Sequence, residues 1–131
     1  MAYTVEFDNS SAPPLVRVRI HGTLTKADFI AMAREVIDLE TRETLAGRRP
    51  PSRLTDLRGL EQIELGYADV RGVVESRRHN TLRTPVRSAV IVETPLHRGF
   101  GRMYQTLNDH PMVSLELFES EAAALEWIGG K

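Results

Sequence analysis

The chain has 131 residues, with 17 Lys and Arg against 18 Asp and Glu, and it contains no cysteine. This length predicts one domain, over residues 1–131, that buries roughly two-thirds of its unfolded surface, and the lack of cysteine excludes disulfides, thiolate metal sites and a cysteine nucleophile. The formal net charge of −1 argues against a general nucleic-acid binder, because such proteins rely on a clear basic excess.

An antiparallel hairpin is predicted at the start of the chain. Apolar and polar residues alternate over residues 3–7 and again over residues 15–21, which is the pattern of strands with one buried face. The segment between them, residues 8–14, is rich in turn-forming residues and contains two prolines. Gly22 is expected to end the second strand.

A helix is predicted next, lasting to about Leu45. Thr25, with Asp28 three residues later, resembles a capping box, and the carboxylate favours the positive end of the helix. The segment AGRRPPS, residues 46–52, cannot continue the helix because its paired prolines lack amide donors and clash with the preceding turn. It is therefore expected to be a loop with two solvated arginines.

The middle of the chain predicts a short strand and a second helix. The sequence RLTDL indicates a strand that ends near Asp56, followed by a connection over residues 58–65. Gly66 is expected to cap the helix, and Asp69 suits its first turn. The inner face of this helix is predicted to consist of Tyr67, Val70 and Val74.

The last third of the chain predicts a strand, a helix, a strand and a capped helix. The apolar run over residues 89–92 suits a central parallel strand that is covered on both faces. Apolar residues then recur at helical spacing from Phe100 to Leu107, and residues 113–118 alternate as a strand. Ser120 can cap the last helix. The core-facing residues of that helix are expected to be Ala122, Leu125 and Ile128.

The element order is therefore β-β-α-β-α-β-α-β-α, which predicts an α/β domain. This order, with LVRVRIHGTLTKADF early and HRGFGRMYQTL and VSLELFESEAAALEWIG late, resembles the SpoIIAA-like, or STAS-like, family, whose better-known relatives are bacterial anti-sigma-factor antagonists. The resemblance covers nearly the whole chain. It implies a mixed sheet of four or five strands with helices packed against it. The leading hypothesis for the function is a regulatory module that binds other proteins without being an enzyme.

One departure from the family pattern changes what is expected of regulation. The antagonists carry a phosphorylatable serine at the start of the second helix, whereas residues 64–69 of this chain offer no hydroxyl except that of Tyr67. Phosphate there would act by adding charge at a helix N-terminus. The usual partner-switching cycle is therefore not expected. The residues predicted to bind a protein partner are Gly66, Tyr67 and Asp69.

The segment ETPLHRGFGR, residues 93–102, is the predicted ligand site. It follows the carboxyl end of a central strand, where open α/β sheets tend to bind ligands. Backbone amides at two glycines would approach a small anion at the helix N-terminus, two arginines would add charge, and a histidine could titrate near neutral pH. The predicted ligand-binding residues are Asp56, His97, Arg98, Gly99, Gly101 and Arg102.

Structural explanations compete with this ligand site. The glycines could simply turn the chain and seat the helix, Asp56 could cap a turn or form a surface ion pair, and His97 could be an ordinary exposed histidine. A small-molecule or lipid-headgroup binder that uses residues 93–102 is the alternative to a protein-binding module. Its resemblance in topology to lipid-transfer domains is analogy only.

The sequence shows no catalytic or metal-binding motif. The four histidines, which include His79, lack helical or HExxH spacing, and no serine lies in a G-x-S-x-G elbow. No cofactor is expected. Basic residues 71–87, which include Arg83, and an acidic last strand and helix could orient two subunits or a charged partner, and a solvated helix face is the competing explanation. Small α/β modules often pair through exposed helices or sheet edges, so a homodimer is expected.

The compartment is predicted from two features of the sequence. No apolar run approaches the ~20 residues that a membrane-spanning helix needs, and the N-terminus has an acidic strand pattern in place of a basic signal peptide. A cytoplasmic protein is therefore expected.

Overall fold

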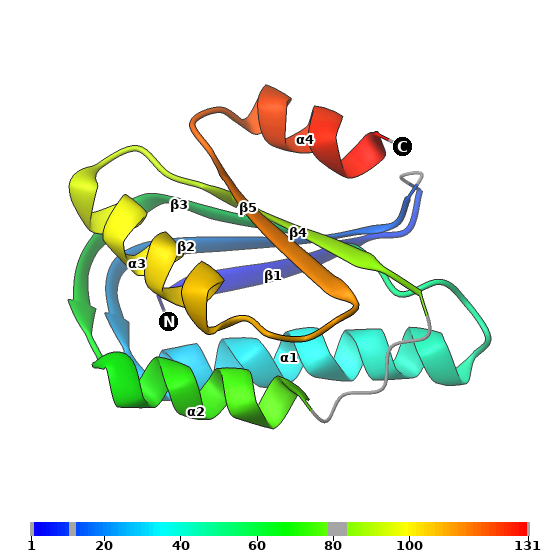
Figure 1. Ribbon diagram of the computed structural model, residues 1–131, viewed down its shortest axis with the longest axis horizontal. Helices are drawn as coiled ribbons and strands as arrows, with labels where there is room; N and C mark the ends of the chain where they lie inside the picture. The colour runs from blue at the N-terminus through cyan, green and yellow to red at the C-terminus, as the bar shows by residue number, and fades with distance from the viewer. Residues whose placement is uncertain (1, 11–12, 79–83, 131) are drawn as a thin grey trace.

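Five strands pair in the order in which they occur in the chain. They are β1 (Tyr3–Asp8), β2 (Leu15–Thr25), β3 (Ser52–Glu64), β4 (Val86–Ile91) and β5 (Val113–Phe118). The first pair of strands is antiparallel and the other pairs are parallel. The computed structural model describes residues 2–10, 13–78 and 84–130 (Figure 1). His79 and Arg83 of the sequence predictions lie outside these residues. The predicted mixed α/β sheet is confirmed.

Helices cover both faces of the sheet, but unequally (Figure 1). They are α1 (Lys26–Leu45), α2 (Tyr67–Arg78), α3 (Pro95–Leu107) and α4 (Glu121–Gly129). The first three connect parallel neighbours, and right-handed crossovers place such helices on one face. Since α4 follows the last strand, it is free to fold onto the other face. The described elements follow one another in the predicted order.

Two cores follow from this arrangement. The larger core lies between the sheet and α1, α2 and α3, and Phe29 of α1 packs edge-on against Phe100 of α3 with ring centroids 5.8 Å apart. The smaller core lies under α4. Its buried residues are Leu15, Leu54, Ala89, Ile91, Ala124 and Ile128. No helix in the described part of the chain is long and apolar enough to cross a membrane.

The second and third strands are longer than predicted. Gly22 does not end β2, since it has a φ of +65°, which suits glycine, and the strand continues through a register shift at this point. Likewise, β3 does not end near Asp56. Its second half pairs with the end of β2, and Gly59 sits where a Cβ would come within 3.0 Å of the Cβ of His21.

Helix starts were predicted better than helix faces. The Thr25 and Ser120 side chains cap α1 and α4, each accepting a hydrogen bond from a backbone N–H three residues later. The Asp28 carboxylate bonds the N–H of Ala2 instead of closing a capping box. Two face assignments were wrong. Tyr67 is exposed, and the inner face of α4 is built from Ala124 and Ile128 while Ala122 and Leu125 are exposed.

Candidate functional site

Helix α3 begins earlier than predicted, and this changes the nature of the predicted ligand loop. Thr94 is the N-cap and Pro95 the first helical residue, so Gly99 and Gly101 lie inside the helix. Amides inside an α-helix donate to carbonyls four residues earlier. The predicted glycine loop that would present these amides to an anion is therefore wrong.

Gly101 lies where α3 packs against the sheet. This agrees with the structural explanation considered above, in which the glycines seat the helix. A Cβ at this position would lie 2.9 Å from Cδ2 of Leu117, so a larger residue would require the Leu117 side chain to shift. Gly99 differs, because a Cβ there would meet nothing within 4 Å. Of these two glycines, only Gly101 therefore lies in close contact with the sheet.

His97 is a buried structural residue and not an exposed loop histidine, since its exposed fraction is 1%. Its Nδ1 accepts hydrogen bonds from the N–H groups of Glu93 and Thr94, at 3.1 and 3.2 Å. Its Nε2 lies 2.8 Å from the carbonyl oxygen of Leu60. These partners require a neutral ring with the proton on Nε2. The ring thereby ties the start of α3 to β3.

The two predicted arginines do lie together, at a notch of about 180 Å³ between α3 and β5. Its lining residues are Val92, Arg98, Arg102, Leu117, Phe118 and Glu119. Arg98 already donates a hydrogen bond of 2.6 Å to the Glu119 carboxylate, while Arg102 is exposed. An anion at this notch would therefore compete with Glu119 for Arg98.

Asp56 is not part of this notch. It neighbours Arg19 and Ile91 on the adjacent strands, on the sheet face that α4 covers, whereas α3 packs on the opposite face. Arg58 donates to it from both its side chain, at 2.8 and 3.0 Å, and its backbone. Burial raises the pKa of Asp56, but these hydrogen bonds and the Arg58 charge outweigh it and hold the pKa below its usual value. Asp56 therefore forms an ion pair with Arg58, which is the alternative to ligand binding considered from the sequence.

The three predicted partner-binding residues do lie together, at the start of α2. The Gly66 carbonyl accepts from the N–H of Asp69, and the Asp69 carboxylate accepts from the N–H of Gly66 at 2.9 Å. The Gly66 hydrogen bond, and then Lys26 at 3.4 Å, lower the pKa of Asp69. The predicted helix start is therefore confirmed, with a fixed negative charge in its first turn. Between these two residues, Tyr67 is 57% exposed.

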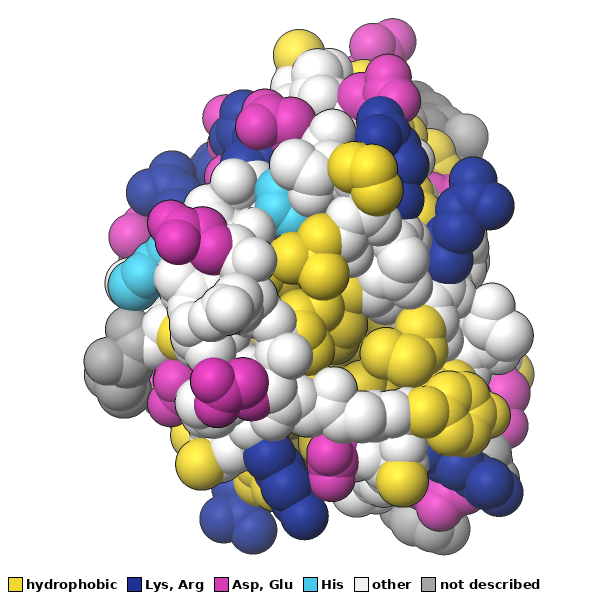
Figure 2. Space-filling view, turned by 90° about the vertical axis from the view of Figure 1, so that its left-hand side faces the viewer, with side chains coloured by type: hydrophobic (Ala, Val, Ile, Leu, Met, Phe, Trp, Pro, Cys, Tyr) yellow, Lys and Arg dark blue, Asp and Glu magenta, His cyan; other side chains and the backbone are white. Residues whose placement is uncertain are grey.

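A groove of about 370 Å³ separates α1 from α2 beside this helix start. Its lining residues are Lys26, Ile30, Ala33, Arg34, Ile37, Ala68, Asp69, Gly72, Val73 and Ser76. Figure 2 looks onto the end of the molecule where α2 and α3 begin, and hydrophobic side chains gather there in a hollow between charged ones. No sequence pattern indicated the groove, because it arises from the spacing of two helices.

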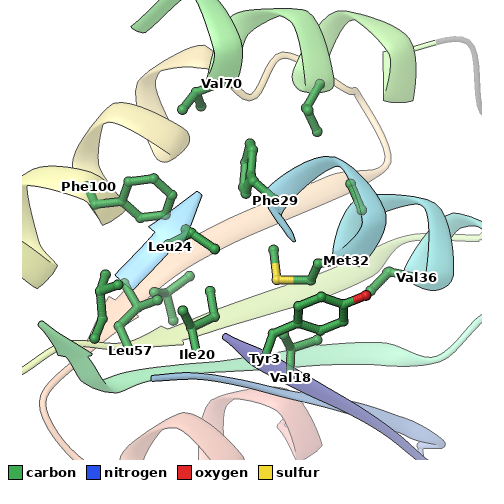
Figure 3. Close-up of a cluster of buried hydrophobic side chains, with 14 of the residues drawn as sticks. Tyr3, Val18, Ile20, Leu24, Phe29, Met32, Val36, Leu57, Val70 and Phe100 are labelled. Atoms are coloured by element: carbon green, nitrogen blue, oxygen red, sulfur yellow. The ribbon is translucent and has the colours of Figure 1, made fainter. Parts of the chain in front are cut away.

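An internal cavity of about 50 Å³ lies between the sheet and helices α1 and α3. Most of its lining is apolar, and Phe29, Met32 and Val36 of α1 project toward the strands there (Figure 3). Arg53 also lines it, and its Nε donates to the Glu40 carboxylate at 2.6 Å. Their side chains are 8% and 0% exposed.

This buried ion pair was missed from the sequence, although a signal existed. Glu40 occurs four residues after Val36, on the apolar stripe of α1. A carboxylate at such a position needs a buried partner.

The described residues offer no metal site. No three His, Asp or Glu side chains within residues 2–10, 13–78 and 84–130 are grouped so that they could hold an ion.

Comparisons with known proteins address the whole chain. The family model described as SpoIIAA-like matches residues 15–129. Among solved structures, the chain is similar to an uncharacterized protein from the DUF3478 family with a SpoIIAA-like fold, from Shewanella loihica PV-4. The match has a TM-score of 0.65 and 19% sequence identity, and covers 97% of this chain and 94% of that one. Such identity shows the fold alone. No curated protein matches.

Proposed function

Because the chain belongs to the SpoIIAA-like family, we propose that it is a non-enzymatic regulatory module that binds another protein. The contact surface is the start of α2 together with the groove between α1 and α2. The observation that carries this proposal is the groove of about 370 Å³, which opens beside Ala68 and Asp69, the residues that follow Tyr67 in α2. An exposed tyrosine is a residue type enriched at protein interfaces.

The lining of the groove defines the chemistry of the partner. Ile30, Ile37 and Val73 supply apolar surface, while the charge of Lys26 is compensated by Asp69. Arg34 is exposed at the rim. An amphipathic helix, with an apolar residue for the groove and an acidic residue for Arg34, meets these requirements.

Regulation at this surface differs from a phosphorylation switch. Asp69 already provides a negative charge in the first turn of α2, and its lowered pKa keeps it charged at neutral pH. The surface therefore binds in one permanent charge state. Partner level, and not phosphorylation at this helix start, controls the complex.

Photocrosslinking tests the proposal. Tyr67 is replaced by p-benzoylphenylalanine, and captured proteins are identified with and without a second change, Gly72→Arg. Because a Cβ at Gly72 meets nothing within 4 Å, arginine fits the helix and fills the groove without harm to the fold. Capture should fall at least about tenfold, the loss of ~1.4 kcal/mol of binding.

The matched control is Gly99→Arg, on α3, where a Cβ also meets nothing within 4 Å. It should leave capture from position 67 unchanged. Capture that survives Gly72→Arg at full strength, or that falls equally with both variants, would show that the groove is not the contact surface.

A small anionic ligand is the second candidate, favoured by the two arginines at the notch of about 180 Å³. Binding would transfer Arg98 from Glu119 to the anion and recruit Arg102. Native mass spectrometry of gently purified protein reports any such adduct. Arg102→Ala should remove it, and its persistence would exclude this notch.

A further inference from the structure

Strand β1 lies at an edge of the sheet, and no further strand among residues 2–10, 13–78 and 84–130 pairs with its outer side. The N–H of His21 donates to the carbonyl of Ala2 at 2.9 Å, and β1 pairs antiparallel with β2 in this register. Even-numbered residues of β1 therefore exchange hydrogen bonds with β2, because hydrogen-bonded positions alternate along an antiparallel pair. The N–H and C=O groups of Tyr3, Val5 and Phe7 point away from the sheet.

The opposite edge of the sheet is partly capped by side chains. Residues such as Met112 and Phe118 direct their carbonyls toward β4, so the odd-numbered residues of β5 face outward. Gln105 and Asn108, at the end of α3, donate side-chain hydrogen bonds to the carbonyls of Leu115 and Val113, at 2.9 and 3.0 Å. The β5 edge is thus protected by side chains, as edge strands of monomeric sheets usually are.

The free edge of β1 has a sequence that is complementary to itself. If two copies pair antiparallel about Val5, the outward groups of Tyr3 meet those of Phe7 in the second copy, and Val5 meets Val5. Each of these pairs exchanges two N–H···O bonds. All of these side chains lie on the α1 face, where Val5 and Phe7 are half-buried. The pairing therefore aligns two aromatic pairs and covers apolar surface.

Charges on the other face of β1 agree with the same register. Thr4 and Glu6 are exposed there, and pairing about Val5 places Thr4 opposite Glu6 of the second copy. No like charges stand directly opposite each other. A register centred on Glu6 would place two carboxylates directly opposite each other, which disfavours it.

We propose that a second copy of this chain binds at the β1 edge and joins the two sheets into one continuous ten-stranded sheet with a two-fold axis at Val5. The two α1 helices then lie on the same face and run side by side across the axis. Leu39, half-buried on the side of α1 that carries Glu35, adds apolar surface at this junction.

Sedimentation over a range of concentrations tests the dimer. The full chain should sediment with twice the chain mass, and Val5→Pro should return it to monomer. This proline removes an outward N–H that β2 does not use, so the β1–β2 ladder remains. A wild-type protein that stays monomeric at every concentration, or a folded Val5→Pro variant that still dimerises, would overturn the proposal.

Charge variants at Thr4 keep the test decisive if the proline variant fails to fold. Thr4→Glu faces Glu6 of the second copy and should weaken dimerisation roughly fivefold. Within its own chain it faces Arg19, which favours the monomer fold. Thr4→Lys should strengthen the dimer by a similar factor. The control, Thr106→Glu on exposed α3 surface, should change nothing. Equal dimerisation of Thr4→Glu and Thr4→Lys would overturn the proposed register.

Discussion

The two faces of the sheet are covered in contrasting ways. Three helices cover one face and enclose a continuous apolar core, whereas α4 alone covers the other, over β3, β4 and β5. On the α4 side, β2 presents Arg17, Arg19 and His21. The same sheet thus has one face shielded from water and one face that is half open.

The same chemical interaction occurs on both faces. Arg53–Glu40 and Arg17–Glu121 are arginine–carboxylate pairs, each with an N···O distance of 2.6 Å. The side chains of the first pair are 8% and 0% exposed, and those of the second are 22% and 37% exposed. Their geometry is the same and their access to water is not. Burial, and not distance, should therefore decide how much each pair matters.

Removing one partner of the buried pair should have the largest effect on stability. Glu40→Leu leaves the Arg53 guanidinium buried without this carboxylate, and breaking such a pair costs about 3–5 kcal/mol. Denaturant unfolding, followed by circular dichroism, measures the loss. A change below about 1 kcal/mol would show that Arg53 is satisfied in the folded protein without Glu40, by water or by another group.

The double variant Glu40→Leu/Arg53→Met is the control for that experiment. It replaces both charges with apolar groups of similar length, so no charge is left buried. Exchanging a buried pair for apolar residues is often neutral or stabilising. The double variant should therefore recover most of the lost free energy of unfolding. Failure to recover would assign the loss to poor packing and not to the charge.

Tyr3 allows a smaller test on the same face, with pH as the variable. A hydrogen bond to Glu35, followed by burial and the nearby negative charges, raises the pKa of Tyr3 to about 12, from a usual value of 10.0. The folded state thus favours the neutral phenol. The contribution of Tyr3 to the free energy of unfolding is complete below pH 10 and is lost as the pH rises toward 12.

Tyr3→Phe should flatten the alkaline decline in stability and cost about 1 kcal/mol at neutral pH, the value of one hydrogen bond. Urea unfolding at several pH values between 8 and 12 measures both effects. Tyr67→Phe, at a position 57% exposed, is the matched control and should keep the wild-type decline. A Tyr3→Phe profile identical to the wild type would contradict the assigned hydrogen bond.

The order of strands and helices could be predicted because it depends on local patterns. Apolar alternation over residues 113–118 and the caps at Thr25 and Ser120 are written within a few neighbouring residues, and the structure has them in place. The length of β3 could not be predicted in this way. Within the described residues its second half pairs with β2 and not with β4, and Gly59 lies where β2 and β3 approach closely.

The candidate site was predicted only where backbone geometry decides it. Gly66 and Asp69 form the predicted helix start because their hydrogen bonds join residues three apart. In contrast, the role of His97 depends on Leu60, thirty-seven residues earlier in the chain. Glycines at 99 and 101 look alike in sequence, yet only Gly101 faces a strand. The partner of a residue in a contact between distant elements cannot be identified from its neighbours in the sequence.

The exposed ion pair on the α4 face should show the smallest effect. Glu121→Gln removes the carboxylate that accepts from Arg17 at 2.6 Å and that lies 3.9 Å from Arg58. Water can solvate both guanidinium groups, so the loss should be about 0.2–1 kcal/mol and should shrink in 1 M salt. Urea unfolding with and without salt measures it. A loss as large as that of Glu40→Leu would mean that α4 excludes water from this pair, and that the two faces differ less than their exposure indicates.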